Sequence, residues 1–160
     1  MKKALLIIAV LLLVLIGTAV WFYQSIQNDF FAEHDDAIQV ALSHTSLTRA
    51  DHVDYYAGEA PVRIVYGVNA ENEKLIVWVS DDDIHEEKAA NGVDREQIHK
   101  LVADRHGQVE WIRLVPGMYQ ETLVWEAFFK RSEQAGVRHY YEYYRFQDGA
   151  RVDTLRLGLE

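Results

Sequence analysis

Residues 62–79 read VRIVYGVNAENEKLIVWV, and this stretch predicts an antiparallel β-hairpin. In residues 62–68 the apolar side chains at even positions alternate with Arg63, Val65 and Gly67, which is typical of a strand with one buried face. Residues 75–79 form a second strand-like run that is apolar on both faces. The polar residues 69–73 between the two strands supply a hairpin loop.

The residues before this hairpin predict a helix and one more strand. From Asp29 to Thr45 the apolar positions follow one helical stripe, with polar side chains on the opposite face. Residues 53–57 then form a short run typical of a strand. After the hairpin, the acidic residues 81–83 are expected to end this sheet segment and to lie in solvent, where they keep a strand edge from pairing.

The second half of the chain repeats this order. Asp94 and Gln97 have the spacing of a capping box, and Gly107 is a suitable C-terminal cap, so the sequence predicts a helix between them. Asp148-Gly149 is a strong hairpin signal. Strand-like runs follow the helix at residues 109–115, 123–130, 138–146 and 151–159.

Each half therefore reads as a helix followed by antiparallel strands, which is an internal duplication of an α+β arrangement. We expect a helix to pack on a small sheet in each unit. The predicted organisation is an N-terminal anchor and junction in residues 1–28, a first unit in residues 29–93 and a second unit in residues 94–160.

The N-terminus predicts a transmembrane anchor. Lys2 and Lys3 precede an apolar run whose ends are Ala4 and Tyr23. Roughly 20 apolar residues in a helix match a hydrocarbon core about 30 Å thick. Because the nearby positive charges precede the run, we expect the N-terminus in the cytoplasm and the rest of the chain outside a cell membrane, held by contact with membrane lipid.

A cleaved signal peptide is the competing interpretation, since residues 17–19 read Gly-Thr-Ala and resemble a cleavage site. The apolar and aromatic residues 20–23 continue past that site, which favours an uncleaved anchor. The chain has no cysteine, so no disulfide stabilises it.

Charge and motifs exclude several function classes. A net charge of −9 argues against nucleic acid, whose phosphates would repel the chain. His99 and His106 are seven positions apart on the predicted helix, without a properly spaced third ligand, so we expect no metal site. Because no nucleophile elbow or glycine-rich phosphate loop occurs either, we expect no enzyme, no cofactor and no small-molecule ligand.

The tract of residues 138–146 is unusually aromatic. Tyr141 and Tyr143 share one face of this strand, and Tyr140 and Tyr144 share the other. One face is expected under the helix, and the other is either a partner-binding surface or a set of cross-strand aromatic pairs. The candidate partner-binding residues are Tyr140, Tyr141, Tyr143, Tyr144 and Arg145.

In the order of these features the chain resembles the YpmB/TseB family of Gram-positive membrane-anchored proteins. The matching features run through nearly the whole chain: the Lys2-Lys3 start, Tyr55-Tyr56, residues 74–79, residues 88–93, residues 123–126 and Tyr140-Tyr141. The resemblance implies two PepSY-like units, each with a cystatin-like fold. It also implies a non-enzymatic regulator of lateral cell-wall elongation that binds a monofunctional penicillin-binding protein.

Two alternatives remain open at this point. PepSY-like units elsewhere are associated with restraint of peptidases, so the chain is alternatively an inhibitor or chaperone of an extracytoplasmic peptidase. A small wall hydrolase is the other alternative, with Glu126 and Glu142 on neighbouring strands as its carboxylate pair.

Overall fold

The computed structural model of this protein describes residues 2–58, 61–134 and 136–158, and the side chains of residues 2–10 and 24–33 lie outside that description. The chain divides into two compact units, Met1–Asp36 and Ala37–Glu160. The domain bounds expected from the sequence, 29–93 and 94–160, stay a prediction.

Helix α1 (Lys2–His44) is continuous from the N-terminus to the first sheet. The expected junction between an anchor and a separate helix beginning at Asp29 is therefore wrong. Residues 24–36 contain neither proline nor glycine, so nothing in the backbone interrupts the helix there. Within the part of the chain that the structure describes, no helix has the length and apolar character needed to cross a membrane. Ala4, the expected start of the anchor, is among the residues whose side chains are not described, and the anchor stays a prediction.

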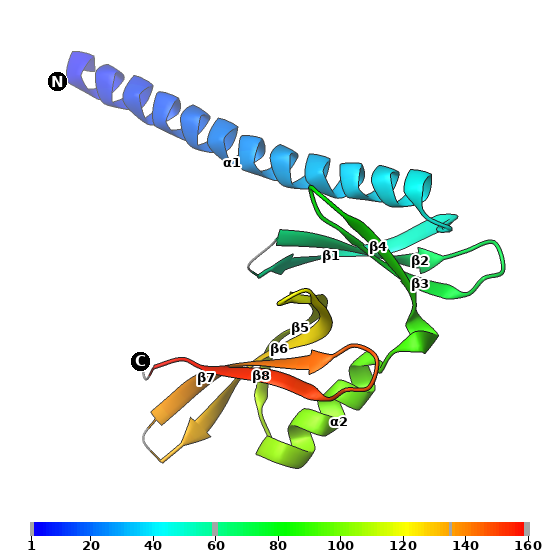
Figure 1. The fold of residues 1–160 in the computed structure, drawn as a ribbon. Helices are drawn as coiled ribbons and strands as arrows, with labels where there is room; N and C mark the ends of the chain where they lie inside the picture. Colours follow the sequence, from blue (N-terminus) through cyan, green and yellow to red (C-terminus); the bar gives the residue numbers. More distant parts are fainter. Residues whose placement is uncertain (1, 59–60, 135, 159–160) are drawn as a thin grey trace. The chain divides into compact units, whose positions relative to one another are not determined.

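The first sheet has the strand order β1 (Arg49–Ala57), β2 (Pro61–Val68), β3 (Lys74–Val79) and β4 (Ile84–Lys88), with all neighbours antiparallel (Figure 1). The expected hairpin is confirmed as β2 and β3. Strand β4 is missing from the sequence prediction because its residues, Ile-His-Glu-Glu-Lys, have little β-propensity and are ordered by pairing with β3.

Both faces of the first sheet are covered. Val65 pairs with Val77 across the sheet, and this face packs on the last turns of α1 through Ala37 and Ala41. On the opposite face, Trp78 lies in a cluster with side chains of the second half of the chain. The β3 segment, whose residues 75–79 are apolar on both faces, is thus buried on both sides.

Helix α2 (Arg95–His106) follows the short 3₁₀ helix η1 (Ala89–Asn91). The expected capping box forms, with the Asp94 carboxylate accepting from the Gln97 backbone N–H at 2.8 Å and the Gln97 side chain accepting from the Asp94 backbone N–H at 2.7 Å. The helix ends at His106, and Gly107 caps it with a φ of 70° that suits glycine.

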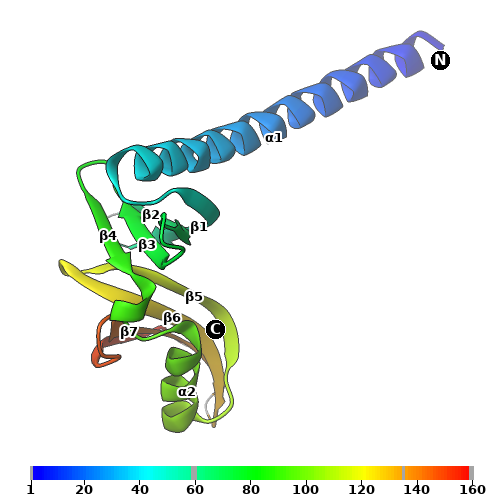
Figure 2. The ribbon, with the colours of Figure 1, turned by 90° about the vertical axis from the view of Figure 1, so that its right-hand side faces the viewer.

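The second sheet has the order β5 (Glu110–Tyr119), β6 (Thr122–Glu133), β7 (Gly136–Arg145) and β8 (Arg151–Arg156), again antiparallel throughout. The expected turn at Asp148-Gly149 lies between β7 and β8, and Gly149 has a φ of 69°. Figures 1 and 2 show α2 along one face of this sheet. Ile98 and Val102 of α2 are fully buried against it.

One core cluster joins the two sheets. Trp78 of β3 meets Phe146, after β7, edge to face at a centroid distance of 5.4 Å. Tyr56 of β1 lies so close to Gly117 of β5 that a Cβ at that glycine would overlap the tyrosine ring. The two sheets of residues 37–160 therefore share a core and do not form two independent ones.

Candidate functional site

The face of the second sheet opposite α2 is open at one end. Phe128 of β6 pairs with Tyr141 of β7, which pairs with Leu155 of β8, so the three side chains lie on one face. Val137 lies four positions before Tyr141 on β7, and Leu157 lies two positions after Leu155, just beyond the end of β8. Both therefore share this face. Val137, Leu155 and Leu157 are 45%, 43% and 45% exposed. We call these five residues the open face.

The open face is aromatic at its centre and bordered by polar residues. The Phe128 and Tyr141 rings stack with a centroid distance of 4.1 Å and an interplanar angle of 8°. His139 contacts Phe128, and Lys130, which pairs with His139 across the sheet, forms an ion pair of 2.7 Å with Glu110. Apolar patches with a polar border are typical of protein-binding surfaces.

The structure divides the five candidate residues between the two sides of the sheet. Tyr140 and Tyr144 lie on the side of α2, where they are 7% and 1% exposed. Tyr143 lies on the opposite side but is covered by Tyr119, whose ring stacks on it at 4.2 Å. Tyr141 is half-buried within the open face, and the exposed Arg145 forms an ion pair of 2.9 Å with Asp148. Partner binding by these residues stays a prediction.

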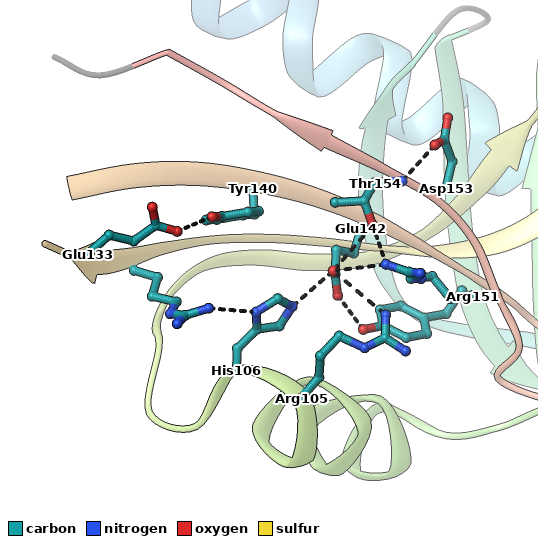
Figure 3. Close-up of polar contacts among 10 residues, drawn as sticks. Arg105, His106, Glu133, Tyr140, Glu142, Arg151, Asp153 and Thr154 are labelled. Atoms are coloured by element: carbon teal, nitrogen blue, oxygen red, sulfur yellow. Dashed lines mark hydrogen bonds and ion pairs between the residues drawn. The ribbon is translucent and has the colours of Figure 1, made fainter. Parts of the chain in front are cut away.

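Beneath α2, Glu142 is the centre of a buried polar cluster (Figure 3). Its side chain is 1% exposed and accepts from His106 Nε2 at 2.9 Å and from Thr154 Oγ1 at 3.2 Å. The Tyr144 hydroxyl donates to its other oxygen. Arg105 and Arg151 lie at 3.8 and 4.0 Å from the same carboxylate.

The two neighbours of His106 indicate which of its ring nitrogens donates and which accepts. Arg131 has only donors and lies 3.3 Å from His106 Nδ1, so that nitrogen accepts. Nε2 then carries the hydrogen and donates to Glu142. The Glu142 carboxylate thus connects α2, β7 and β8, and His106 links this cluster to Arg131 of β6.

Burial by itself would raise the pKa of Glu142, but the hydrogen bonds from Tyr144 and His106 outweigh it and lower the pKa below its ordinary value. For Tyr144, burial together with the Glu142 carboxylate raises the pKa of the hydroxyl. Glu142 is therefore a carboxylate and Tyr144 a neutral donor at neutral pH. This cluster is suited to holding a helix on a sheet.

The carboxylate pair of the hydrolase alternative does not converge. Glu126 pairs with Tyr143 across the sheet, whereas Glu142 pairs with Ala127 one position further on, so the two side chains lie on opposite faces. Arg113 donates to Glu126 at 2.6 Å on that other face. The hypothesis that Glu126 and Glu142 form the carboxylate pair of a hydrolase is therefore wrong.

The two histidines of α2 have separate surroundings. His99 meets the Trp111 ring at a centroid distance of 4.2 Å, while His106 belongs to the Glu142 cluster. Burial lowers the pKa of His99, and the neighbouring Arg95 lowers it further. Among the residues that the structure describes, no three side chains of the metal-binding types are grouped to hold an ion.

The sequence interpretation missed most of the open face. Of its five residues, Tyr141 is among the predicted partner-binding residues, whereas Phe128, Val137, Leu155 and Leu157 are not. The available signal was the spacing of two between Leu155 and Leu157, which puts them on one face. That spacing does not say which face α2 covers.

Two comparisons with known proteins agree with the sequence-based resemblance. Residues 36–80 match the family model of the cell wall elongation regulator TseB-like domain. These residues run from the end of α1 through β3. The resemblance to the YpmB/TseB family is thereby confirmed, and the matched segment supports a regulatory role.

The fold is also similar to that of a solved structure, the YpmB protein from Bacillus subtilis. The TM-score is 0.69 at 21% sequence identity, over 78% of this chain and 97% of that one. At this identity the likeness shows a shared fold. None of the curated proteins matches the chain.

Proposed function

We propose that this chain is a non-enzymatic, membrane-anchored extracytoplasmic regulator of lateral cell-wall elongation, which binds a monofunctional penicillin-binding protein. The observation that carries the proposal is the TseB-like domain in residues 36–80. The open face is the surface through which we expect the partner to bind.

The chemistry of the open face supports this assignment. It presents an aromatic pair, Phe128 and Tyr141, with exposed aliphatic side chains beside it, and aromatic residues are enriched at protein interfaces. The buried carboxylates of the same sheet are already engaged, Glu126 by Arg113 and Glu142 by His106. A role in binding thus has a surface, whereas a role in hydrolysis lacks its carboxylate pair.

The anchor is part of the proposal. The large apolar side chains described between Leu11 and Tyr23 are all at least half exposed, with Trp21 at 70%. A helix with apolar side chains around its whole circumference is stable where lipid surrounds it. An N-terminus in the cytoplasm then places residues 37–160 outside the membrane.

The test is binding of the full-length chain, held in lipid nanodiscs, to the purified extracytoplasmic part of an elongation-specific penicillin-binding protein. Leu155→Asp places a charge on the open face, beside Tyr141, and should weaken binding about tenfold or more, as expected for a residue in a buried interface. Leu101→Asp is the matched control because Leu101 is 37% exposed on α2, away from the open face.

Saturable binding that Leu155→Asp weakens and Leu101→Asp does not would support the proposal and locate the surface. Binding that neither change affects would remove the open face from the proposal. No binding in this experiment would overturn the proposal and favour restraint of an extracytoplasmic peptidase, which can then be measured as inhibition of cell-surface proteases.

A further inference from the structure

A groove of about 480 Å³ lies on the face of the first sheet that carries Trp78, near the loop that joins β2 to β3. Residues of the segment between η1 and α2 form one wall, and Trp125 of β6 forms another. Its volume is in the range of small-ligand sites, roughly 300–1,000 Å³. It therefore accommodates a short segment of chain and not a folded domain.

The floor of this groove is apolar, and the polar atoms of its side chains are hydrogen-bonded to neighbouring residues. Ile76 is 5% exposed, and Trp125 is 4% exposed with its indole N–H donating to the Val93 carbonyl at 2.9 Å. Tyr66 contributes a half-buried ring whose hydroxyl donates to Asp54 at 2.9 Å. Because these polar atoms are already bonded, the groove offers mainly apolar surface to a ligand.

The residues that line the groove carry more positive than negative charges, although the chain as a whole is acidic. Arg49, Lys74 and Arg95 line it together with the acidic residues Asp51 and Asp94, in a protein whose net charge is −9. Arg49 is engaged by Asp51 at 2.8 Å. Asp94 caps the N-terminus of α2.

Two cations remain for a ligand. Arg95 lies over the Trp125 ring at 5.6 Å and 3.7 Å from Asp54, yet half of its side chain is exposed. Lys74 is exposed and has no ion-pair partner among the described residues. The acidic Glu73 next to it is held by Lys88 at 2.8 Å.

We propose that this groove binds an extended peptide segment of a protein partner, with an apolar side chain against Ile76 and Trp125 and a carboxylate beside Lys74. The apolar floor supplies the binding energy, and the unpaired cation at its edge selects an acidic segment over a basic one. The site is separate from the open face, because Trp125 pairs with Tyr144 and so lies on the α2 side of the second sheet.

The experiment uses the full-length chain in phosphatidylcholine nanodiscs and three blocked peptides of one length. The first is acetyl-Gly-Leu-Glu-Leu-Gly-amide, and the other two replace its glutamate by glutamine or lysine. Binding is followed through the indole N–H signal of Trp125 in nuclear magnetic resonance spectra, assigned with a Trp125→Phe variant. Empty nanodiscs correct for partition of the peptides into lipid.

We expect saturable shifts of the Trp125 signal with the glutamate peptide and at least about tenfold weaker binding of the lysine peptide, with the glutamine peptide between them. Lys74→Glu should reverse this order. Lys100→Glu makes the same charge change on α2 outside the groove, and it should keep the order of the original chain.

Equal shifts with all three peptides, or no shift at millimolar concentration, would overturn the proposal. A Trp125 shift that follows the concentration of the chain itself would assign the groove to a second copy and would overturn it too. Lys74→Glu should leave binding of the penicillin-binding protein unchanged, so the two proposals can fail separately.

Discussion

The first sheet, β1–β4, and the second sheet, β5–β8, have the same strand order, but only one of them is covered on both faces. α1 and the shared core cover the two faces of the first sheet at Val77 and Trp78. Among the described residues, the second sheet has α2 on one face, while its other face is covered at the Tyr143 end and exposed at Leu155. The difference teaches that two sheets with the same strand order can differ in exposure. A sheet face stays exposed where neither a helix nor the other sheet packs against it.

The largest effect should come from the core that both sheets share. Trp78 is 1% exposed and contacts Phe146, so Trp78→Ala leaves a cavity between the first sheet and the second half of the chain. We expect a loss of about 3–5 kcal/mol in the free energy of unfolding, measured by chemical denaturation. A loss close to zero, or two separate unfolding transitions, would show that the sheets do not share a core.

The next effect tests the polar cluster on the covered face of the second sheet. Glu142→Gln removes the charge that His106 and Tyr144 stabilise, and we expect a loss of about 2–3 kcal/mol at neutral pH. The pKa of Glu142 is lowered in the folded protein, so its contribution is present above the ordinary value of 4.5 and is lost as the pH falls through the folded pKa.

The difference in stability between Glu142→Gln and the unchanged chain should therefore narrow in acid. The measurement is denaturant unfolding of both proteins from neutral pH down to well below pH 4.5, the ordinary value of this group. A difference that stays constant over this range would contradict a stabilising carboxylate at this position.

A smaller effect should follow at the contact of Tyr56 with β5. Gly117→Ala places a methyl group against the Tyr56 ring, which has to move. We expect a loss of about 1–3 kcal/mol, the usual cost of overpacking. Gly158→Ala is the matched control, because no atom lies within 4 Å of its added Cβ. Equal thermal stability of the two variants would show that the sheets are not in close contact here.

The smallest effect is expected on the open face. Leu155→Ser changes a side chain that is 43% exposed, so the free energy of unfolding should change by no more than about 0.5 kcal/mol. Thermal unfolding of this variant beside Trp78→Ala compares the open face with the covered core. A loss as large as that of a core substitution would mean that another part of the molecule covers Leu155.

The local structure was largely predictable from short-range patterns. The hairpin at residues 62–79, the capping box of Asp94 and Gln97 and the turn at Asp148-Gly149 are all observed. Each depends on residues that are close in sequence, through period-two alternation, side-chain capping or a glycine with positive φ. The exceptions are the uninterrupted α1 and the polar strand β4.

The sequence by itself determined that residues 138–145 lie in a strand with tyrosines on both faces. Only the tertiary structure decided which tyrosines are buried, because alternation looks the same whichever face the helix covers. It also decided that Glu126 and Glu142 lie apart and that Glu142 meets His106, which is 36 positions away. Contacts between distant segments depend on strand register and packing, and the spacing of nearby residues in the sequence determines neither.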